Sequence, residues 1–186
     1  MKCTHVILAT VGLAACAPAG SGHELPSHAS VPVTTRIEGV SSAYEVTTHT
    51  TDPSARHVVD VAPDLAWKLV PLVYAELELP GAVLDPRGRM FGFERERMRR
   101  KVGDAPLTKI VNCGTGVTGP NALTYVVTLD VVTLVSPVAA GSSAIETRVQ
   151  GFAKPRSVSG NPVRCATTGA LELYIAERIR ALAAKV

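Results

Sequence analysis

The stretch ALTYVVTLDVVTLVS (residues 122–136) alternates apolar and polar side chains along most of its length. One side carries apolar residues and the other polar ones: Tyr125, Val127, Leu129 and Val131 against Thr124, Thr128 and Asp130. Successive side chains of a β-strand point to opposite faces of a sheet, so this period of two predicts a long strand. We expect one face of its sheet to be buried and the other to be solvated.

The next stretch along the chain has the same period. SSAIETRVQGFAK (residues 142–154) follows a turn at residues 137–141 and sets Ile145, Thr147 and Val149 against polar neighbours. We expect a second strand with one buried face.

Three segments before residue 122 are also strand-like. AYEVTTHT (residues 43–50) and ARHVVDVA (residues 55–62) are rich in β-branched residues and flank the turn DPS (residues 52–54), so we expect them to pair as a hairpin. APLTKIVNC (residues 105–113) predicts a single strand.

A second hairpin is expected in AVLDPRGRMFGFERE (residues 82–96). Pro86 presets the backbone behind Asp85 at the turn, and Gly88 can supply the left-handed residue that such turns need. The turn chemistry therefore predicts two short antiparallel strands here.

Two segments have helical periodicity. PDLAWKLVPLVYAELEL (residues 63–79) repeats apolar residues every three to four positions behind Pro63, with Trp67 as a core residue, but Pro71 should kink or divide the helix. GALELYIAERIRALAAKV (residues 169–186) predicts a helix that covers one face of the sheet, with Thr168 as its N-cap. Its apolar stripe consists of Leu171, Ile175, Ile179 and Leu182.

Strands follow strands in this order with only two helices, which favours an antiparallel α+β fold over a doubly wound sheet. We expect a sheet of about five to seven strands packed against two helices, in a single domain over residues 43–186. A small β-barrel with one C-terminal helix is the alternative.

The N-terminus has the layout of an export signal. Lys2 precedes an apolar run, VILATVGLAA (residues 6–15), which is shorter than the ~20 residues that span a bilayer. Leu13, Ala14, Ala15 and Cys16 follow the lipobox pattern, so this segment resembles a bacterial lipoprotein precursor. The resemblance implies cleavage of residues 1–15 and acylation of Cys16; cleavage near residues 17–19 as a plain secretory signal is the alternative.

The lipobox resemblance also implies a location. The protein would lie in the bacterial cell envelope, held to the membrane by its lipid. Ala17 in place of Asp after the acylated cysteine implies the outer membrane, facing the periplasm. Residues 16–42 are rich in Gly, Ser, Pro and Thr, and we expect them to form a lipidated N-terminus and flexible tether.

Cysteine usage agrees with export. Of four cysteines, Cys3 leaves with the signal and Cys16 takes the lipid, so the mature chain keeps Cys113 and Cys165. An oxidising compartment favours a disulfide between them, and two buried free thiols are the alternative.

The glycines of CGTGVTG (residues 113–119) have the spacing of a dinucleotide-binding fingerprint. That fingerprint must open a helix and be followed by an acidic residue about 20 positions later. Here a strand-like stretch follows instead, so we expect a strand-to-strand loop and no nucleotide cofactor.

One segment is distinctive in charge. RGRMFGFERERMRRK (residues 87–101) holds seven cations against two carboxylates in a chain of net charge +3. Anionic headgroups or an acidic envelope protein could bind this surface, and a solvated sheet edge is the alternative. Nucleic acid is disfavoured by export. The candidate residues are Arg95, Arg97, Arg99, Arg100 and Lys101.

No sequence motif indicates a reaction. The chain lacks a nucleophile elbow, an H-E-x-x-H helix, a P-loop and a C-x-x-C pair, and His23 and His28 alone are too few for a metal site. We therefore expect a non-catalytic accessory or interaction module without a cofactor. Two alternatives are a binder of an apolar small molecule or lipid in a sheet–helix cavity, and an envelope hydrolase. The hydrolase would use His49 or His57 with Asp52, Asp60 or Asp64.

The order of the expected elements is similar to that of helix-grip-type envelope lipoproteins, such as the accessory lipoprotein of outer-membrane barrel assembly. The similarity lies in element order, without shared motif residues. It implies a fold and carries no function.

Overall fold

A computed structural model of the chain describes residues 31–38, 43–50, 54–156 and 161–186. It is an α+β fold built on a seven-stranded antiparallel sheet, in which β4, β5, β11, β12, β13 and β8 are neighbours in that order and β3 pairs with β12. The strands are β3 (Ser54–Val59), β4 (Ala82–Asp85), β5 (Met90–Arg97), β8 (Val111–Asn112), β11 (Val126–Ala139), β12 (Ser142–Lys154) and β13 (Val163–Thr167).

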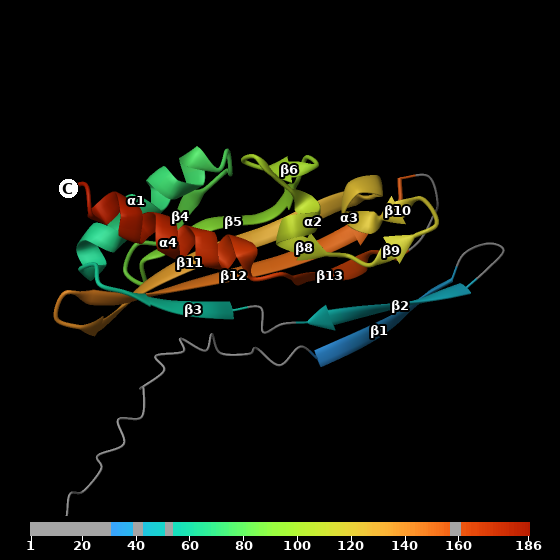
Figure 1. Cartoon of the computed structure of the whole chain (residues 1–186), viewed down its shortest axis with the longest axis horizontal. Coiled ribbons are helices and arrows are strands. Elements are labelled where there is room, and N and C mark those ends of the chain that lie inside the picture. Colours follow the sequence, from blue (N-terminus) through green and yellow to red (C-terminus); the bar gives the residue numbers. More distant parts are fainter. Residues whose placement is uncertain (1–30, 39–42, 51–53, 157–160) are drawn as a thin grey trace, which may run out of the picture.

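The sheet is open, since neither end of this order pairs with the other. The expected α+β sheet is therefore confirmed, and the small β-barrel is wrong. Two long helices, α1 (Pro63–Glu76) and α4 (Ala170–Ala183), lie on the same side of the sheet (Figure 1).

The central pair β11–β12 confirms the alternation seen in the sequence. Val131 lies opposite Val149, and the two strands pair almost from end to end. Along β11 every second side chain is buried from Val127 to Val135, and Thr133 is among them. These buried side chains lie on the side of the sheet that α1 and α4 cover, where most of the apolar area is removed from water.

An aromatic and hydroxyl cluster fills the space between α1 and the sheet. The ring of Tyr74 packs edge-on against Phe91 and Phe93, with ring centroids 5.1 and 6.4 Å away. Its hydroxyl bonds with the Thr133 hydroxyl at 2.9 Å, which bonds in turn with that of Thr147 at 3.0 Å. Burial raises the pKa of the Tyr74 phenol, so the cluster stays neutral.

Helix α1 remains one helix across Pro71, although we expect a kink or a break there. Pro71 cannot donate a backbone hydrogen bond. Buried residues on both sides of it, Leu69, Val70, Val73 and Tyr74, hold the two halves against the sheet. Tertiary packing thus outweighs the local cost of the proline.

The apolar stripe of α4 is confirmed at Leu171, Ile175 and Ile179, but the predicted cap is wrong. Gly169 (φ 80°) is the N-cap. The Thr168 hydroxyl accepts a long hydrogen bond from the Ala170 N–H at 3.3 Å and is also within hydrogen-bond distance of the carbonyls of Lys109 and Ile110, at 2.5 and 3.1 Å. It therefore fastens the start of α4 to the segment before β8.

The N-terminal pairing differs from the expected hairpin. Strand β2 (Ala43–Thr50) pairs with β1 (Val31–Glu38), while β3 pairs with residues 143–148 of β12. Strand β13 pairs with β12 only at residues 151–153, which leaves the rest of that edge for β3. Strand β1 also lies within the segment 16–42, where we expect a tether without regular structure.

Two local predictions also change. Residues 105–113 are not one strand but β7 (Ala105–Pro106), the short helix α2 (Leu107–Ile110) and β8, and β7 pairs with β6 (Lys101–Val102). The hairpin of β4 and β5 is confirmed, but its left-handed residue is Arg89 (φ 50°) rather than Gly88.

Candidate functional site

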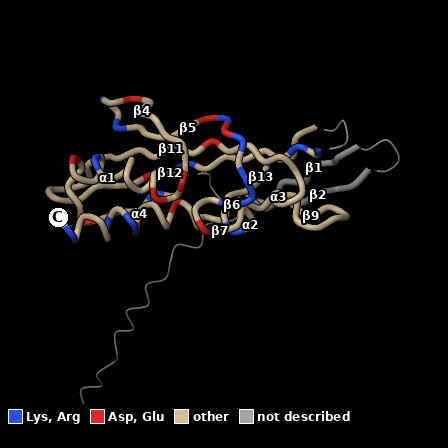
Figure 2. The backbone as a smooth tube through the Cα atoms, turned by 90° about the horizontal axis from the view of Figure 1, so that it is seen from above, with Lys and Arg blue, Asp and Glu red and all other residues tan. Residues whose placement is uncertain are grey.

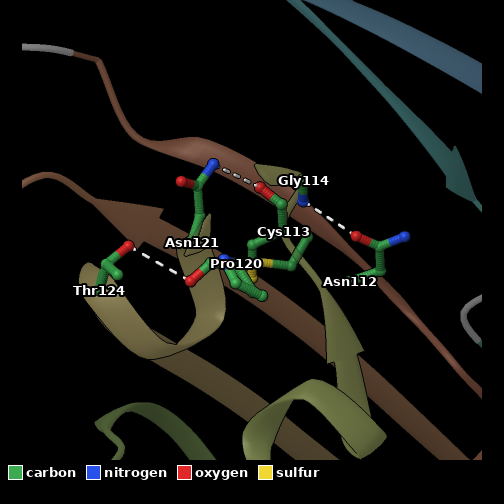
Figure 3. Close-up of a disulfide and its surroundings, with 7 residues drawn as sticks. Asn112, Cys113, Gly114, Pro120, Asn121 and Thr124 are labelled. Carbon is green, nitrogen blue, oxygen red and sulfur yellow. Dashed lines mark hydrogen bonds between the residues drawn. A yellow bond between two sulfur atoms is a disulfide. The ribbon is translucent and has the colours of Figure 1, made fainter. Parts of the chain in front are cut away.

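The Cys113–Cys165 disulfide is present in the structure (Figure 3). It joins the end of β8 to β13, with the two Cα atoms 4.1 Å apart, and both cysteines are buried. The Asn121 amide donates to the Cys113 carbonyl at 3.0 Å, and the Gly114 N–H donates to the Asn112 side chain at 2.9 Å (Figure 3). The disulfide therefore belongs to a bonded corner of the domain.

The glycine-rich segment next to the disulfide forms turns. Its residues make the two-residue strands β9 (Thr115–Gly116) and β10 (Gly119–Pro120), which pair with each other. Gly114 (φ 75°) and Gly119 (φ 108°) take backbone angles that favour glycine. The four-residue helix α3 (Asn121–Thr124) precedes β11, where we expect a strand alone. The segment is thus a loop between strands, as predicted, with one extra helical turn.

The structure divides the basic segment. Arg95, Arg97, Arg99, Arg100 and Lys101 are all exposed. Met98 is half-buried against the core, and its N–H donates to the Val127 carbonyl. Blue cations and red carboxylates mix along β5, and the cations continue toward β6 (Figure 2). Arg97 lies beside Thr128 of β11, whereas Lys101 belongs to β6, so the five cations do not share one element. Arg97, Arg99 and Lys101 nevertheless line one groove of about 290 Å³.

Two grooves lie beside the C-terminal end of α1. The first has a volume of about 430 Å³ and the second about 290 Å³, and both are lined by Leu77, Glu78, Val102 and Gly103. The first also has apolar walls from α2 and α4 and is bordered by charged residues: Glu76, Asp104 and Lys109. Neither groove lies in the sheet–helix interface that the Tyr74 cluster fills.

Among these carboxylates, Glu76 is already paired. Arg178 of α4 donates to its two oxygens at 2.6 and 2.8 Å. These hydrogen bonds lower the pKa of the Glu76 carboxyl, so it stays ionised as a link between the two long helices.

Glu78 has an unusual backbone. The N–H of Glu78 bonds to the Ala75 carbonyl and that of Leu79 to the Tyr74 carbonyl, which is the Schellman pattern at the end of α1. The left-handed position of this motif usually holds glycine, yet Glu78 occupies it with φ 53°. A side chain there costs about 1 kcal/mol, and it places a carboxylate where the two grooves meet.

Of the residues considered for hydrolysis, the three that the structure describes with their side chains, His57, Asp60 and Asp64, do not line either groove. Asp64 is 81% exposed and pairs with Arg89 at 2.6 Å, and Asp60 accepts a hydrogen bond from Ser142 at 3.2 Å. His57 is half-buried on β3. The side chain of His49 and the whole of Asp52 lie outside the described residues.

A buried carboxyl that we did not predict lies at the start of α4. Glu172 is fully buried, and Thr167 donates to its Oε1 at 2.5 Å. Its Oε2 is buried and has no hydrogen-bond partner among the described residues. Burial raises the pKa of Glu172, and the hydrogen bond from Thr167 offsets part of this rise. A glutamate three positions after Gly169, at the third helical position, is the signal that could have identified it.

We predict that the stability of the protein falls as pH rises above about 4.5, because folded Glu172 holds its proton more tightly than the unfolded chain does. The slope contributed by this group is at most about 1.4 kcal/mol per pH unit. This slope should be absent in the Glu172→Gln variant. The free energy of unfolding is measured by urea titration at several pH values from acid to neutral. Glu177→Gln, an exposed change on the same helix, should keep the slope; equal slopes in both variants would contradict the assignment.

Within the described ranges, no helix combines the length and apolar character needed to cross a bilayer. Those ranges also hold no group of three or more His, Cys, Asp or Glu side chains that could bind a metal ion. Comparison with protein families, with curated proteins and with solved structures finds no match to this chain.

Proposed function

We propose that this protein is a non-catalytic lipoprotein of the bacterial envelope, anchored through Cys16 and acting as an accessory or interaction module. Residues 13–16, which suggest the anchor, lie outside the described residues, so the lipobox sequence alone supports that part. The structural observation that supports an interaction module is a sheet with its long helices on one side only (Figure 1). The other side keeps exposed apolar residues, including Val58 and Phe152.

The anchor is tested by replacing Cys16 with serine. Cys16→Ser should move the protein from the membrane fraction to the soluble fraction and abolish incorporation of labelled palmitate, because a serine hydroxyl cannot form the thioether to the lipid. Fractionation and labelling of cells that express each variant measure this. The matched control is Cys3→Ser, which alters a cysteine inside the expected signal and should change neither result. Unchanged labelling of Cys16→Ser would contradict the proposal.

The proposed location is the outer membrane, facing the periplasm. Ala17 after the expected acylation site supports it. Separation of inner and outer membranes on a density gradient shows which membrane holds the protein. Recovery with the inner membrane would contradict the proposed location but not the proposed lipid anchor.

Ligand binding is the second candidate function, and the groove of about 430 Å³ is the observation that favours it. Its walls include Leu77, Val102 and Ile110, and its border carries the carboxylates of Glu78 and Asp104 against the single ammonium of Lys109. These features fit a long-chain amine better than a fatty acid. A ligand that binds only the folded state raises the melting temperature of the protein. Thermal unfolding in the presence of the long-chain amine and of the fatty acid therefore shows which of the two binds. An unchanged melting temperature with both compounds would argue against ligand binding.

A further inference from the structure

The side of the sheet away from the helices carries its own pattern of side chains. Because strand residues alternate, the side chains between the buried positions of β11 and β12 point away from the helices. Phe152 is 41% exposed there, and Val58 of β3 is 53% exposed. We name this side the open face; its positions are Val126, Thr128, Asp130, Val132, Leu134, Glu146, Arg148, Gln150, Phe152 and Lys154, with the residues paired beside them on β3, β5 and β13.

The strand register places cations on both sides of the exposed ring. Arg97 of β5 lies beside Thr128, Thr128 beside Phe152, and Phe152 beside Arg164 of β13. This row therefore crosses four strands with a phenylalanine between two arginines. Lys154 lies two residues further along β12, on the same face.

The open face has an excess of positive charge. Its five cations, all exposed, come from four strands: Arg56, Arg97, Arg148, Lys154 and Arg164. Three carboxylates share it: Asp130, Glu146 and, in the row of Leu134 and Met90, Asp85 of β4. Asp130 already accepts a hydrogen bond from the Arg95 N–H at 2.5 Å. Five cations against three carboxylates leave an excess of two positive charges on this face.

We propose that the open face docks on an anionic lipid bilayer. Cations near such a surface each gain about 1 kcal/mol, and an exposed apolar ring gains further by entering the interface. The cations are spread over strands rather than gathered around one pocket, which suits an extended charged surface better than a single acidic side chain of a protein. The inference rests on the proposed lipid anchor, which would hold the domain within reach of the membrane.

The position of the N-terminal strands agrees with this orientation. In Figure 1, α1 and α4 lie above the sheet, whereas β1 lies below it. Strand β1 is the described segment nearest in sequence to Cys16. A chain anchored through Cys16 would therefore approach the membrane with its helices directed away from the lipid.

The test uses the full mature chain with Cys16→Ser, so that acylation makes no contribution. Binding is measured by cosedimentation with phosphatidylcholine vesicles containing about 30 mol% phosphatidylglycerol and with pure phosphatidylcholine vesicles. The open-face variant combines Arg148→Ser, Lys154→Ser and Arg164→Ser. Its matched control combines Arg99→Ser, Arg100→Ser and Lys101→Ser, which removes the same charge from the segment after β5.

We expect the parent chain to bind the anionic vesicles and to be released at about 0.5 M salt. The open-face variant, which lacks three cations, should bind roughly 100-fold more weakly, and its matched control should change little. Equal losses of vesicle binding in both variants would overturn the proposal, because they would show that net charge alone attracts the protein. Absence of binding by the parent chain would overturn it as well.

Folding and the anchor are checked separately. If the open-face variant fails to unfold cooperatively, Phe152→Ser replaces it and should weaken binding, whereas Arg148→Lys with Arg164→Lys should retain it. Because no chain in this assay is acylated, its outcome is independent of palmitate labelling at Cys16. Failure of the docking face is therefore distinguishable from failure of the anchor.

Discussion

Replacing Cys113 and Cys165 together by alanine should lower the free energy of unfolding by about 4 kcal/mol. The two cysteines are separated by 52 residues, and the cross-link restricts the unfolded chain over that whole loop. Domains of this size are commonly stable by only about 5 to 15 kcal/mol, so the loss would be a large part of the total. Denaturant titration of the parent and the double variant measures it.

Reduction provides the matched control for this prediction. The parent protein unfolded in the presence of a thiol reductant should match the double alanine variant, because both lack the cross-link. The buried position of the cysteines means that reduction requires opening of the corner where Asn121 bonds to Cys113. A parent protein that unfolds at the same denaturant concentration with and without reductant would contradict a stabilising disulfide, and free thiols in envelope protein would contradict the assumed compartment.

Replacing Gly92 by alanine should cost about 3 kcal/mol. Gly92 lies on β5 opposite Val132, and a Cβ atom there would be 2.1 Å from the Val131 carbonyl oxygen and 2.8 Å from the Val132 Cα. Both atoms belong to the backbone of β11, so the close contacts of the added Cβ atom can be relieved only if β5 moves away from β11. The expected result is a lower melting temperature and weaker packing of Phe91 and Phe93 against Tyr74, measured by thermal unfolding and near-ultraviolet circular dichroism.

Gly88→Ala is the control for this strand. The nearest atom to a Cβ at Gly88 is an Asp85 carboxylate oxygen at 2.6 Å, which can rotate away because it ends a side chain. Its cost should therefore stay below about 1 kcal/mol. Equal losses of stability in Gly88→Ala and Gly92→Ala would show that the contact with β11 does not cause the destabilisation.

Local patterns determined the elements that have one buried and one exposed side. The period of two predicted β11 and β12, and the helical period predicted the stripe of α4, because both patterns follow directly from backbone geometry. The disulfide was also predictable, since removal of the signal and acylation of Cys16 would leave only two cysteines to pair.

Predictions that depended on competition between segments failed. Strands β2 and β3 adjoin in sequence, but the free edge of β12 pairs with β3 and leaves β2 to β1. The local sequence predicts Thr168 as a cap, but Gly169 is the N-cap and the Thr168 hydroxyl lies against the carbonyls of α2. Pro71 could be judged only by its local cost, while the burial around it came from the sheet.

The candidate surfaces also differ in whether the local sequence reveals them. The basic segment is visible in the sequence because its cations lie close together along the chain, although Met98 packs inward among them. The cations of the open face are scattered between Arg56 and Arg164, so no short window of sequence reveals them. The sequence alone determined the strand and helix periods and the cysteine pair, since each depends on neighbouring residues or on simple counting; the export signal stays a prediction from the sequence. Only the tertiary structure decided the strand partners, the buried Glu172 and the open face, because strand register and burial depend on segments that are distant in sequence.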